Sequence, residues 1–274
     1  MSDGQQPDLP RVSAWAPSWA TPAWTARLRA LTPARVGLGR TGVSLETRDL
    51  LDFQRCHAQA RDAVHSRLEA ATLAGALAAI TGTEVLRLRS SAPDRATYLQ
   101  RPDLGRTLDE ASRNLLALND YADKPGIAGS GDERLALIVA DGLSALAVER
   151  HAVPLLTELL PRLDGWRLAP VCVVEQGRVA IGDEIGAVLG AQLSVVLIGE
   201  RPGLSSPDSL GAYITWQPRP GRTDAERNCI SNIRGEGLGY RQAAAQLLYY
   251  LTAARRRQLT GIALKEETHV LREG

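Results

Sequence analysis

The second half of the chain alternates short apolar runs with stretches of helical periodicity, and this alternation most limits how it can fold. The apolar runs span 135–140, 166–174, 193–198 and 211–217, and the helical stretches span 143–163, 181–189 and 241–259. Strands separated by helices form βαβ units, which place parallel strands side by side beneath helices. The run at 193–198 is nearly continuous in its apolar residues and shows little alternation, as expected for a central strand buried on both faces. We therefore expect an α/β fold with a Rossmann-like, mostly parallel sheet and helices on both faces.

The first half of the chain has a different pattern. Apolar residues recur at helical spacing between 47 and 80, a second helix is expected at 108–118, and residues 121–132 are rich in Pro, Gly and Asp. Residues 1–30 mix prolines with Trp15, Trp19 and Trp24, which fits either an arm that docks onto a surface or a disordered tail. These features predict a flexible N-terminal arm (1–30), a helical N-terminal region (31–125) and a Rossmann-like domain (130–274).

Composition excludes several classes of protein. The 274 residues are 44% hydrophobic, enough for a large core, and the net charge of +1 provides no field for holding nucleic acid or an anionic membrane. The three cysteines and four histidines show no spacing typical of a disulfide framework or a metal site. The N-terminus lacks a signal-peptide pattern, and no apolar run approaches the roughly 20 residues of a membrane span. We expect a soluble, cytoplasmic protein with neither a nucleic-acid nor a membrane partner.

Candidate binding residues follow the apolar runs, because ligands of open α/β sheets bind beyond the carboxyl ends of the strands. The three loops are 141–144, 175–179 and 199–204, and in the third an acid and an arginine, Glu200 and Arg201, stand between glycines and a proline. Cys229 is expected in a polar loop near arginines, as a reactive thiol or, more commonly, as a small residue that packs or lines a ligand. A flexible turn at 235–239 precedes the last helix.

Two apparent catalytic motifs lack the context that their chemistry requires. A GxGxxG match at 37–42 follows no clear strand, and the Asp-Gly-Leu-Ser-Ala sequence at 141–145 lacks the second glycine of a nucleophile elbow. We expect Asp141 or Ser144 to cap the following helix, and no histidine stands out as a base for Ser144. The residues alone predict a domain that binds a cofactor or ligand, without a complete catalytic set.

Six short sequences, taken together, resemble the small (light) subunit of ethanolamine ammonia-lyase. They are Gly-Arg-Thr-Gly at 39–42, Arg-Pro-Asp-Leu-Gly-Arg at 101–106, Asp-Gly-Leu-Ser at 141–144, Gly-Arg-Val at 177–179, Gly-Glu-Arg-Pro-Gly-Leu at 199–204 and Cys-Ile-Ser-Asn-Ile at 229–233. Their order and distances match the family from about residue 36 to about residue 262.

The resemblance implies one subunit of an adenosylcobalamin-dependent lyase that converts ethanolamine to acetaldehyde and ammonia. It further implies a hetero-oligomer in which the TIM barrel of a large subunit carries the substrate site, with cobalamin held between that barrel and the small subunit. By motif, Val179, Glu200 and Cys229 correspond to the cobalamin contacts, so that 130–274 becomes a cobalamin-binding domain without catalytic or metal-ligating residues of its own. Packaging of the enzyme in a bacterial microcompartment stays open.

The sequence also bears on the form in which cobalamin would bind. No DxHxxG sequence is present, so we expect the coenzyme to keep its own lower base. Two alternatives remain: a non-catalytic carrier or adaptor for cobalamin or a nucleotide, and a stand-alone Rossmann oxidoreductase that binds NAD at 37–42. A lyase subunit should depend on its partner for strong cobalamin binding, whereas the oxidoreductase should bind NAD alone.

Overall fold

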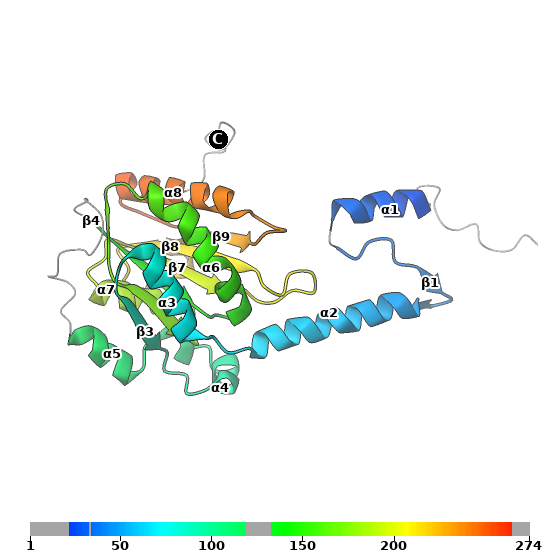
Figure 1. Cartoon of the computed structure of the whole chain (residues 1–274), viewed down its shortest axis with the longest axis horizontal. Coiled ribbons are helices and arrows are strands. Elements are labelled where there is room, and N and C mark those ends of the chain that lie inside the picture. Colours follow the sequence, from blue (N-terminus) through cyan, green and yellow to red (C-terminus); the bar gives the residue numbers. More distant parts are fainter. Residues whose placement is uncertain (1–21, 33, 119–132, 265–274) are drawn as a thin grey trace, which may run out of the picture. The chain divides into compact units, whose positions relative to one another are not determined.

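The computed structural model describes residues 22–32, 34–118 and 133–264, in two compact units (1–58 and 59–274). The first unit contains helix α1 (Pro22–Leu31) and a hairpin of strands β1 (Arg40–Thr41) and β2 (Ser44–Leu45) (Figure 1). Helix α2 (Thr47–His65) begins in the first unit and ends in the second. Residues 1–21 of the expected arm lie outside the described part, whereas 22–30 belong to α1.

A seven-stranded mixed sheet forms the centre of the second unit. Its order is β3 (Val85–Arg89), β6 (Val171–Glu175), β4 (Glu133–Ala140), β7 (Leu193–Gly199), β8 (Leu210–Trp216) and β9 (Arg227–Ile233), with β5 (Trp166–Leu168) paired to β4. The pairings of β3, β6, β4, β5 and β7 are parallel, and those that join β7 to β8 and β8 to β9 are antiparallel. The central strands β4 and β7 are buried along nearly their whole length, which confirms the expectation for 193–198.

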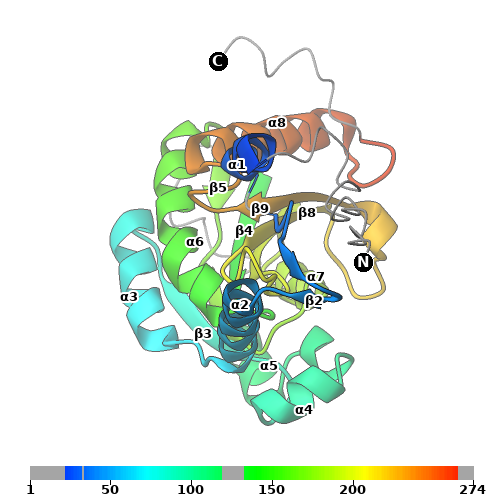
Figure 2. The ribbon, with the colours of Figure 1, turned by 90° about the vertical axis from the view of Figure 1, so that its right-hand side faces the viewer.

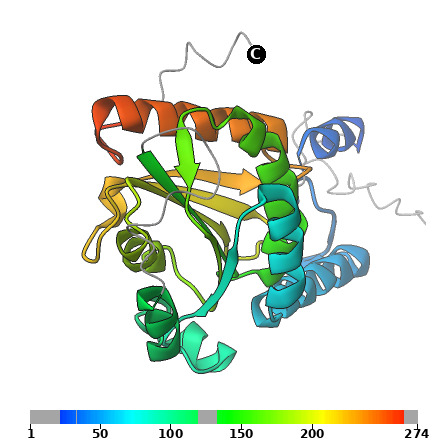
Figure 3. The same ribbon diagram turned by 60° about the vertical axis from the view of Figure 1, so that its left-hand side comes forward.

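Helices cover both faces of this sheet, as Figures 2 and 3 show. One face packs against α3 (Ala70–Thr81), α6 (Ala145–Leu159) and α8 (Tyr240–Arg257), and the other against α5 (Glu110–Ala117) and α7 (Ile181–Val188). Alternate residues of each strand enter the two cores: Leu137 and Val139 face α6, whereas Ile138 and Ala140 face α7.

The expected Rossmann-like, mostly parallel sheet is not confirmed, because the observed sheet is mixed. The connection from β7 to β8 spans residues 200–209 and contains no helix, so the chain returns beside β7 in the opposite direction. The fold is α/β. Strands β3, β6, β4 and β7 are parallel neighbours at one end of the strand order, and β8 and β9 form an antiparallel extension at the other end.

Two expected elements are divided, and one strand was not expected. The run at 166–174 forms two strands, because Ala169 and Pro170 interrupt it and Pro170 has no N–H for a ladder bond. The helical pattern at 47–80 breaks at 66–69 into α2 and α3. Strand β3 comes from the region expected to be helical, where Leu86 and Leu88 face inward between exposed arginines.

The expected domain boundary at 121–132 lies outside the described residues. The division into 31–125 and 130–274 stays a prediction, but β3 pairs in parallel with β6 and so adds residues from before that boundary to the sheet.

All three cysteines lie in the described part and are free. None of the described helices has the length and apolar character needed to cross a membrane. No group of three His, Cys, Asp or Glu side chains within the described ranges is arranged to hold a metal ion.

Candidate functional site

The connections that follow the neighbouring parallel strands β4 and β6 leave the sheet on opposite faces. Helix α6 follows β4 on one face of the sheet, and α7 follows β6 on the other. Such a topological switch point leaves a crevice beyond the strand ends, where ligands of α/β proteins bind. The loops 141–144, 176–180 and 200–209 surround this point.

Two glycines bring the loops after β4 and β7 into backbone contact. Leu143 N–H donates to the carbonyl of Gly199 over 2.9 Å. A Cβ atom at Gly199 would lie 2.0 Å from the carbonyl oxygen of Ser144, and one at Gly142 (φ +56°) would lie 2.3 Å from the carbonyl oxygen of Gly199. The family-like sequences at 141–144 and 199–204 are therefore in direct contact, and this contact requires glycine at both positions.

Asp141 connects the β4 end to the loop after β6. Its Oδ1 accepts from the N–H of Gly177 over 3.2 Å, and its Oδ2 accepts from Arg95 Nη1, also over 3.2 Å. Burial raises the pKa of Asp141 to about 7, against the opposing effects of the Arg95 charge and the backbone donors. Ser144, not Asp141, caps α6 by accepting from Ala147 N–H, so of the two expected capping residues only Ser144 has that role.

The segment at 101–106 packs against the loop after β6. Arg178 N–H donates to the carbonyl of Gly105 over 2.7 Å, and the Arg178 guanidinium stacks 4.3 Å from the ring centre of Tyr98. Tyr98 belongs to helix α4 (Arg95–Gln100), is fully buried and donates from its hydroxyl to the carbonyl of Gly177 over 3.0 Å. Two more family-like sequences, 101–106 and 177–179, thus lie together.

Glu200 joins the end of β7 to the edge strand β9. Its Oε2 accepts from the N–H of Asn232 over 3.1 Å and from the hydroxyl of Ser209. Asn232 stands at an irregularity in the β8–β9 register and has a φ of +60°, which turns its N–H away from the ladder. Glu200 Oε1 has no hydrogen-bond donor in the described ranges, so this half-buried carboxylate can accept one from a ligand.

Cys229 lies in the middle of strand β9, so the expectation of a polar loop there is wrong. Ile230 and Ile233 enter the core while Cys229 and Ser231 stay exposed, which is the alternation of a strand with one buried face. Across the ladder, Cys229 pairs with Tyr213 of β8. Burial raises the pKa of the Tyr213 hydroxyl, and the Cys229 thiol and Glu200 carboxylate raise it further. Tyr213, which the sequence analysis did not single out, therefore lies near both.

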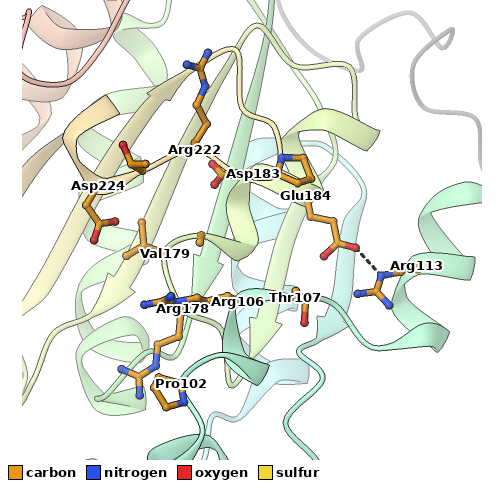
Figure 4. A pocket seen from close by; sticks show the side chains of 14 residues that line it. Pro102, Arg106, Thr107, Arg113, Arg178, Val179, Asp183, Glu184, Arg222 and Asp224 are labelled. Carbon is orange, nitrogen blue, oxygen red and sulfur yellow. Dashed lines mark hydrogen bonds and ion pairs between the residues drawn. The ribbon is translucent and has the colours of Figure 1, made fainter.

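Val179 is half-buried just before α7 and packs against the same apolar cluster as Tyr213. It lines a pocket of about 770 Å³ between the segments 102–107, 178–184 and 220–224 (Figure 4). Val179 and Glu200 follow β6 and β7 at the carboxyl edge of the sheet, as expected, and Cys229 approaches from the antiparallel extension. Glu200 and Cys229 both lie close enough to Tyr213 to raise the pKa of its hydroxyl.

Of the two discounted motifs, 141–145 belongs to the site through Asp141, Gly142 and Ser144, whereas the GxGxxG match does not. Residues 37–42 belong to the first unit, where Gly42 (φ +65°) makes the turn of the β1–β2 hairpin. His57 and His65 lie on α2, and His151 of α6 shares a 2.8 Å hydrogen bond with the Tyr240 hydroxyl. Arg95, Tyr98 and Tyr213 complete the site without a motif. Burial along β8 does not alternate, since Tyr213 is half-buried and every other residue of the strand is buried, so no period-2 signal singles Tyr213 out.

Fold and site together define an α/β protein with a polar candidate site at a topological switch point. Comparison with known proteins assigns the family: the model of the ethanolamine ammonia-lyase light chain (EutC) matches residues 22–265. Proteins named ethanolamine ammonia-lyase small subunit are similar along most of their length. The one from Pseudomonas paraeruginosa is 55% identical over 272 residues (98% of this chain, 93% of the relative), and the one from Azotobacter vinelandii is 58% identical over 250 residues (90% and 89%). The chain belongs to the ethanolamine ammonia-lyase light chain family.

Proposed function

We propose that this protein is the small subunit of an ethanolamine ammonia-lyase, a cytoplasmic hetero-oligomer that converts ethanolamine to acetaldehyde and ammonia. The observation that supports the proposal best is the convergence of family-like sequences at one sheet edge. Four backbone or side-chain hydrogen bonds join them: Leu143 to Gly199, Gly177 to Asp141, Arg178 to Gly105, and Asn232 to Glu200.

The proposed cofactor is adenosylcobalamin, which the small subunit holds against the TIM barrel of the large subunit. A corrin presents amide side chains and an apolar periphery. The free Oε1 of Glu200 can accept an amide N–H, while Val179 and Cys229 supply apolar contact. These three residues are the proposed cobalamin contacts, and their half-buried or exposed positions suit a ligand that a second subunit covers.

When bound, adenosylcobalamin supplies the radical chemistry through cleavage of its cobalt–carbon bond. This chain contributes binding and orientation. The contacts of Gly142 with Gly199 fix the loops after β4 and β7, and Asn232 fixes the Glu200 carboxylate. No residue of this chain is assigned to the reacting substrate, which is proposed to bind in the large subunit.

The test is ethanolamine deamination with adenosylcobalamin, followed as acetaldehyde release, by this chain alone, by the large subunit alone and by the two together. The proposal expects full activity only from the mixture. Equal activity of the large subunit without this chain would contradict it. An inactive mixture in which this chain alone binds cobalamin tightly would instead support a carrier.

A further inference from the structure

The pocket beside Val179 is lined by more arginine side chains than acidic side chains. Four arginines line it, Arg106, Arg113, Arg178 and Arg222. Arg113 pairs with Glu184 at 2.6 Å and Arg222 with Glu226 at 2.5 Å. In the described ranges Arg106 and Arg178 have no carboxylate within ion-pair distance, so the uncompensated charge lies with these two.

The acidic side chains of the pocket are engaged with other arginines. Besides Glu184, these are Asp183 and Asp224, which contact Arg227 at 2.6 Å and 3.6 Å. In the close view Arg106 and Arg178 lie near Pro102, and Arg222 lies at the other end of the pocket (Figure 4). An anion would therefore be attracted to the end of the pocket that Arg106 and Arg178 share.

The backbone holds these two arginines next to each other. Arg178 donates its N–H to Gly105, the residue before Arg106, over 2.7 Å. A Cβ at Gly105 would lie 2.8 Å from Cγ of Arg178, so glycine there allows the two segments to pack closely. Stacking on Tyr98 orients the Arg178 guanidinium, and its Nε is buried without an acceptor in the described residues.

Backbone donors add to this end of the pocket. The N–H groups of Val179 and Ala180, just before α7, have no acceptor in the described part of the chain. Guanidinium groups bind phosphate oxygens through paired hydrogen bonds, and free amides at a helix start favour the same anion. The donor set therefore fits a phosphate group better than a carboxamide or a cation.

We propose that Arg106 and Arg178 form a phosphate subsite beside Val179, and that it takes the phosphodiester of the cobalamin nucleotide loop. This inference rests on the proposed function, and it adds a polar anchor to the corrin contacts. The phosphodiester is the anionic group of cobalamin, whose corrin side chains are neutral amides. Free phosphate has the same chemistry and is distinguished below.

The test uses the full chain in complex with its large subunit and three ligands: cyanocobalamin, cobinamide phosphate and cobinamide, which lacks the nucleotide loop and its phosphate. Equilibrium titrations compare wild type with Arg106→Gln and Arg178→Lys. The matched control is Arg101→Gln, since Arg101 is exposed, pairs with Asp103 at 2.7 Å and does not line the pocket. Each pocket variant should bind cobalamin and cobinamide phosphate about tenfold more weakly, and cobinamide as wild type does. The control should match wild type with all three ligands.

Equal weakening with all three ligands, or none, would overturn the inference. Arg106 is exposed, so its substitution tests the subsite even if Arg178→Lys disturbs folding. A further titration uses inorganic phosphate: binding that Arg106→Gln removes, without any change in preference for cobalamin over cobinamide, would assign the subsite to free phosphate and refute the coenzyme assignment. A wild-type complex that binds neither cobalamin nor cobinamide would refute the proposed function itself.

Discussion

At the scale of single residues, the candidate site depends on glycines at positions where a side chain would overlap the backbone of a neighbouring loop. Gly199 is the clearest case, because its missing side chain lets the β7 end touch the loop that starts α6. The sequence placed a glycine there and a strand end beside it. The carbonyl that it meets, that of Ser144, lies 55 residues earlier and becomes visible only in the fold.

Gly199→Ala should therefore destabilise the protein by about 1–3 kcal/mol or more, because the added methyl group overlaps backbone that cannot move freely. Gly75→Ala is the matched control: Gly75 lies inside α3 with open space around it, so the same methyl group should raise the free energy of unfolding by about 0.5–1 kcal/mol. Urea unfolding of both variants measures the difference. A Gly199→Ala variant as stable as Gly75→Ala would show that the loops do not pack as described.

Asp141 gives a pH prediction at the same scale. Its pKa is raised to about 7 in the folded state by burial, above its ordinary value of 3.8. Between these two values the folded protein binds more protons at this group than the unfolded chain does, so this group's contribution to stability falls as pH rises and levels off above about 7. Asp141→Asn removes the titration. Relative to wild type, the variant should gain stability with rising pH from 5 to 7, by at most about 1.4 kcal/mol per pH unit.

The measurement is the free energy of unfolding of both proteins at pH 5, 6, 7 and 8. A difference between them that stays constant over this range, or that changes against the variant as pH rises, would contradict the assigned pKa shift.

At the scale of elements, a buried ion pair fixes α7 against the antiparallel extension. Arg227 at the start of β9 donates to both carboxylate oxygens of Asp183 on α7, at 2.7 Å and 2.6 Å, and both side chains are about 2% exposed. Asp183 also lines the pocket beside Val179. Neither partner follows from the sequence, since 44 positions separate them.

Arg227→Met should destabilise the protein by about 3–5 kcal/mol, because it leaves the Asp183 carboxylate buried without its partner. The double variant Arg227→Met, Asp183→Asn should recover part of that loss, since no uncompensated charge remains. Thermal or urea unfolding of the two single variants and the double variant completes the cycle. Strictly additive losses would mean that the two side chains do not interact in solution.

The edge strands β3 and β9 are the two strands of the seven-stranded sheet that sequence reasoning missed. Central strands such as β7 are almost entirely apolar and stand out, whereas β3 alternates Leu86 and Leu88 with arginines, and β9 alternates isoleucines with exposed Cys229 and Ser231. Period-2 alternation is a weaker signal over five to seven residues, and polar edge positions resemble a loop. The position of Cys229 was misjudged for this reason.

At the scale of the whole molecule, the sequence was sufficient for an α/β fold with helices on both faces and for the positions of Val179 and Glu200 beyond the carboxyl ends of β6 and β7. It was not sufficient for the direction of β8 and β9. Direction depends on whether the connection at 200–209 carries a helix across the sheet, and that loop has no periodicity to decide it. Three further residues complete the site: Arg95, Tyr98 and Tyr213. Contacts between distant parts of the sequence bring them there, and none of them belongs to a recognisable motif.

The most direct test of the central claim, that this chain supplies part of a cobalamin site completed by the large subunit, is an equilibrium titration with adenosylcobalamin. It compares the chain alone, the large subunit alone, their complex, and the complex with Glu200→Ala. We expect strong binding only in the complex, and a loss of about 1–3 kcal/mol in the variant because a corrin amide loses its acceptor. Binding as strong to either subunit alone as to the complex, or unchanged affinity in the Glu200→Ala complex, would contradict the claim.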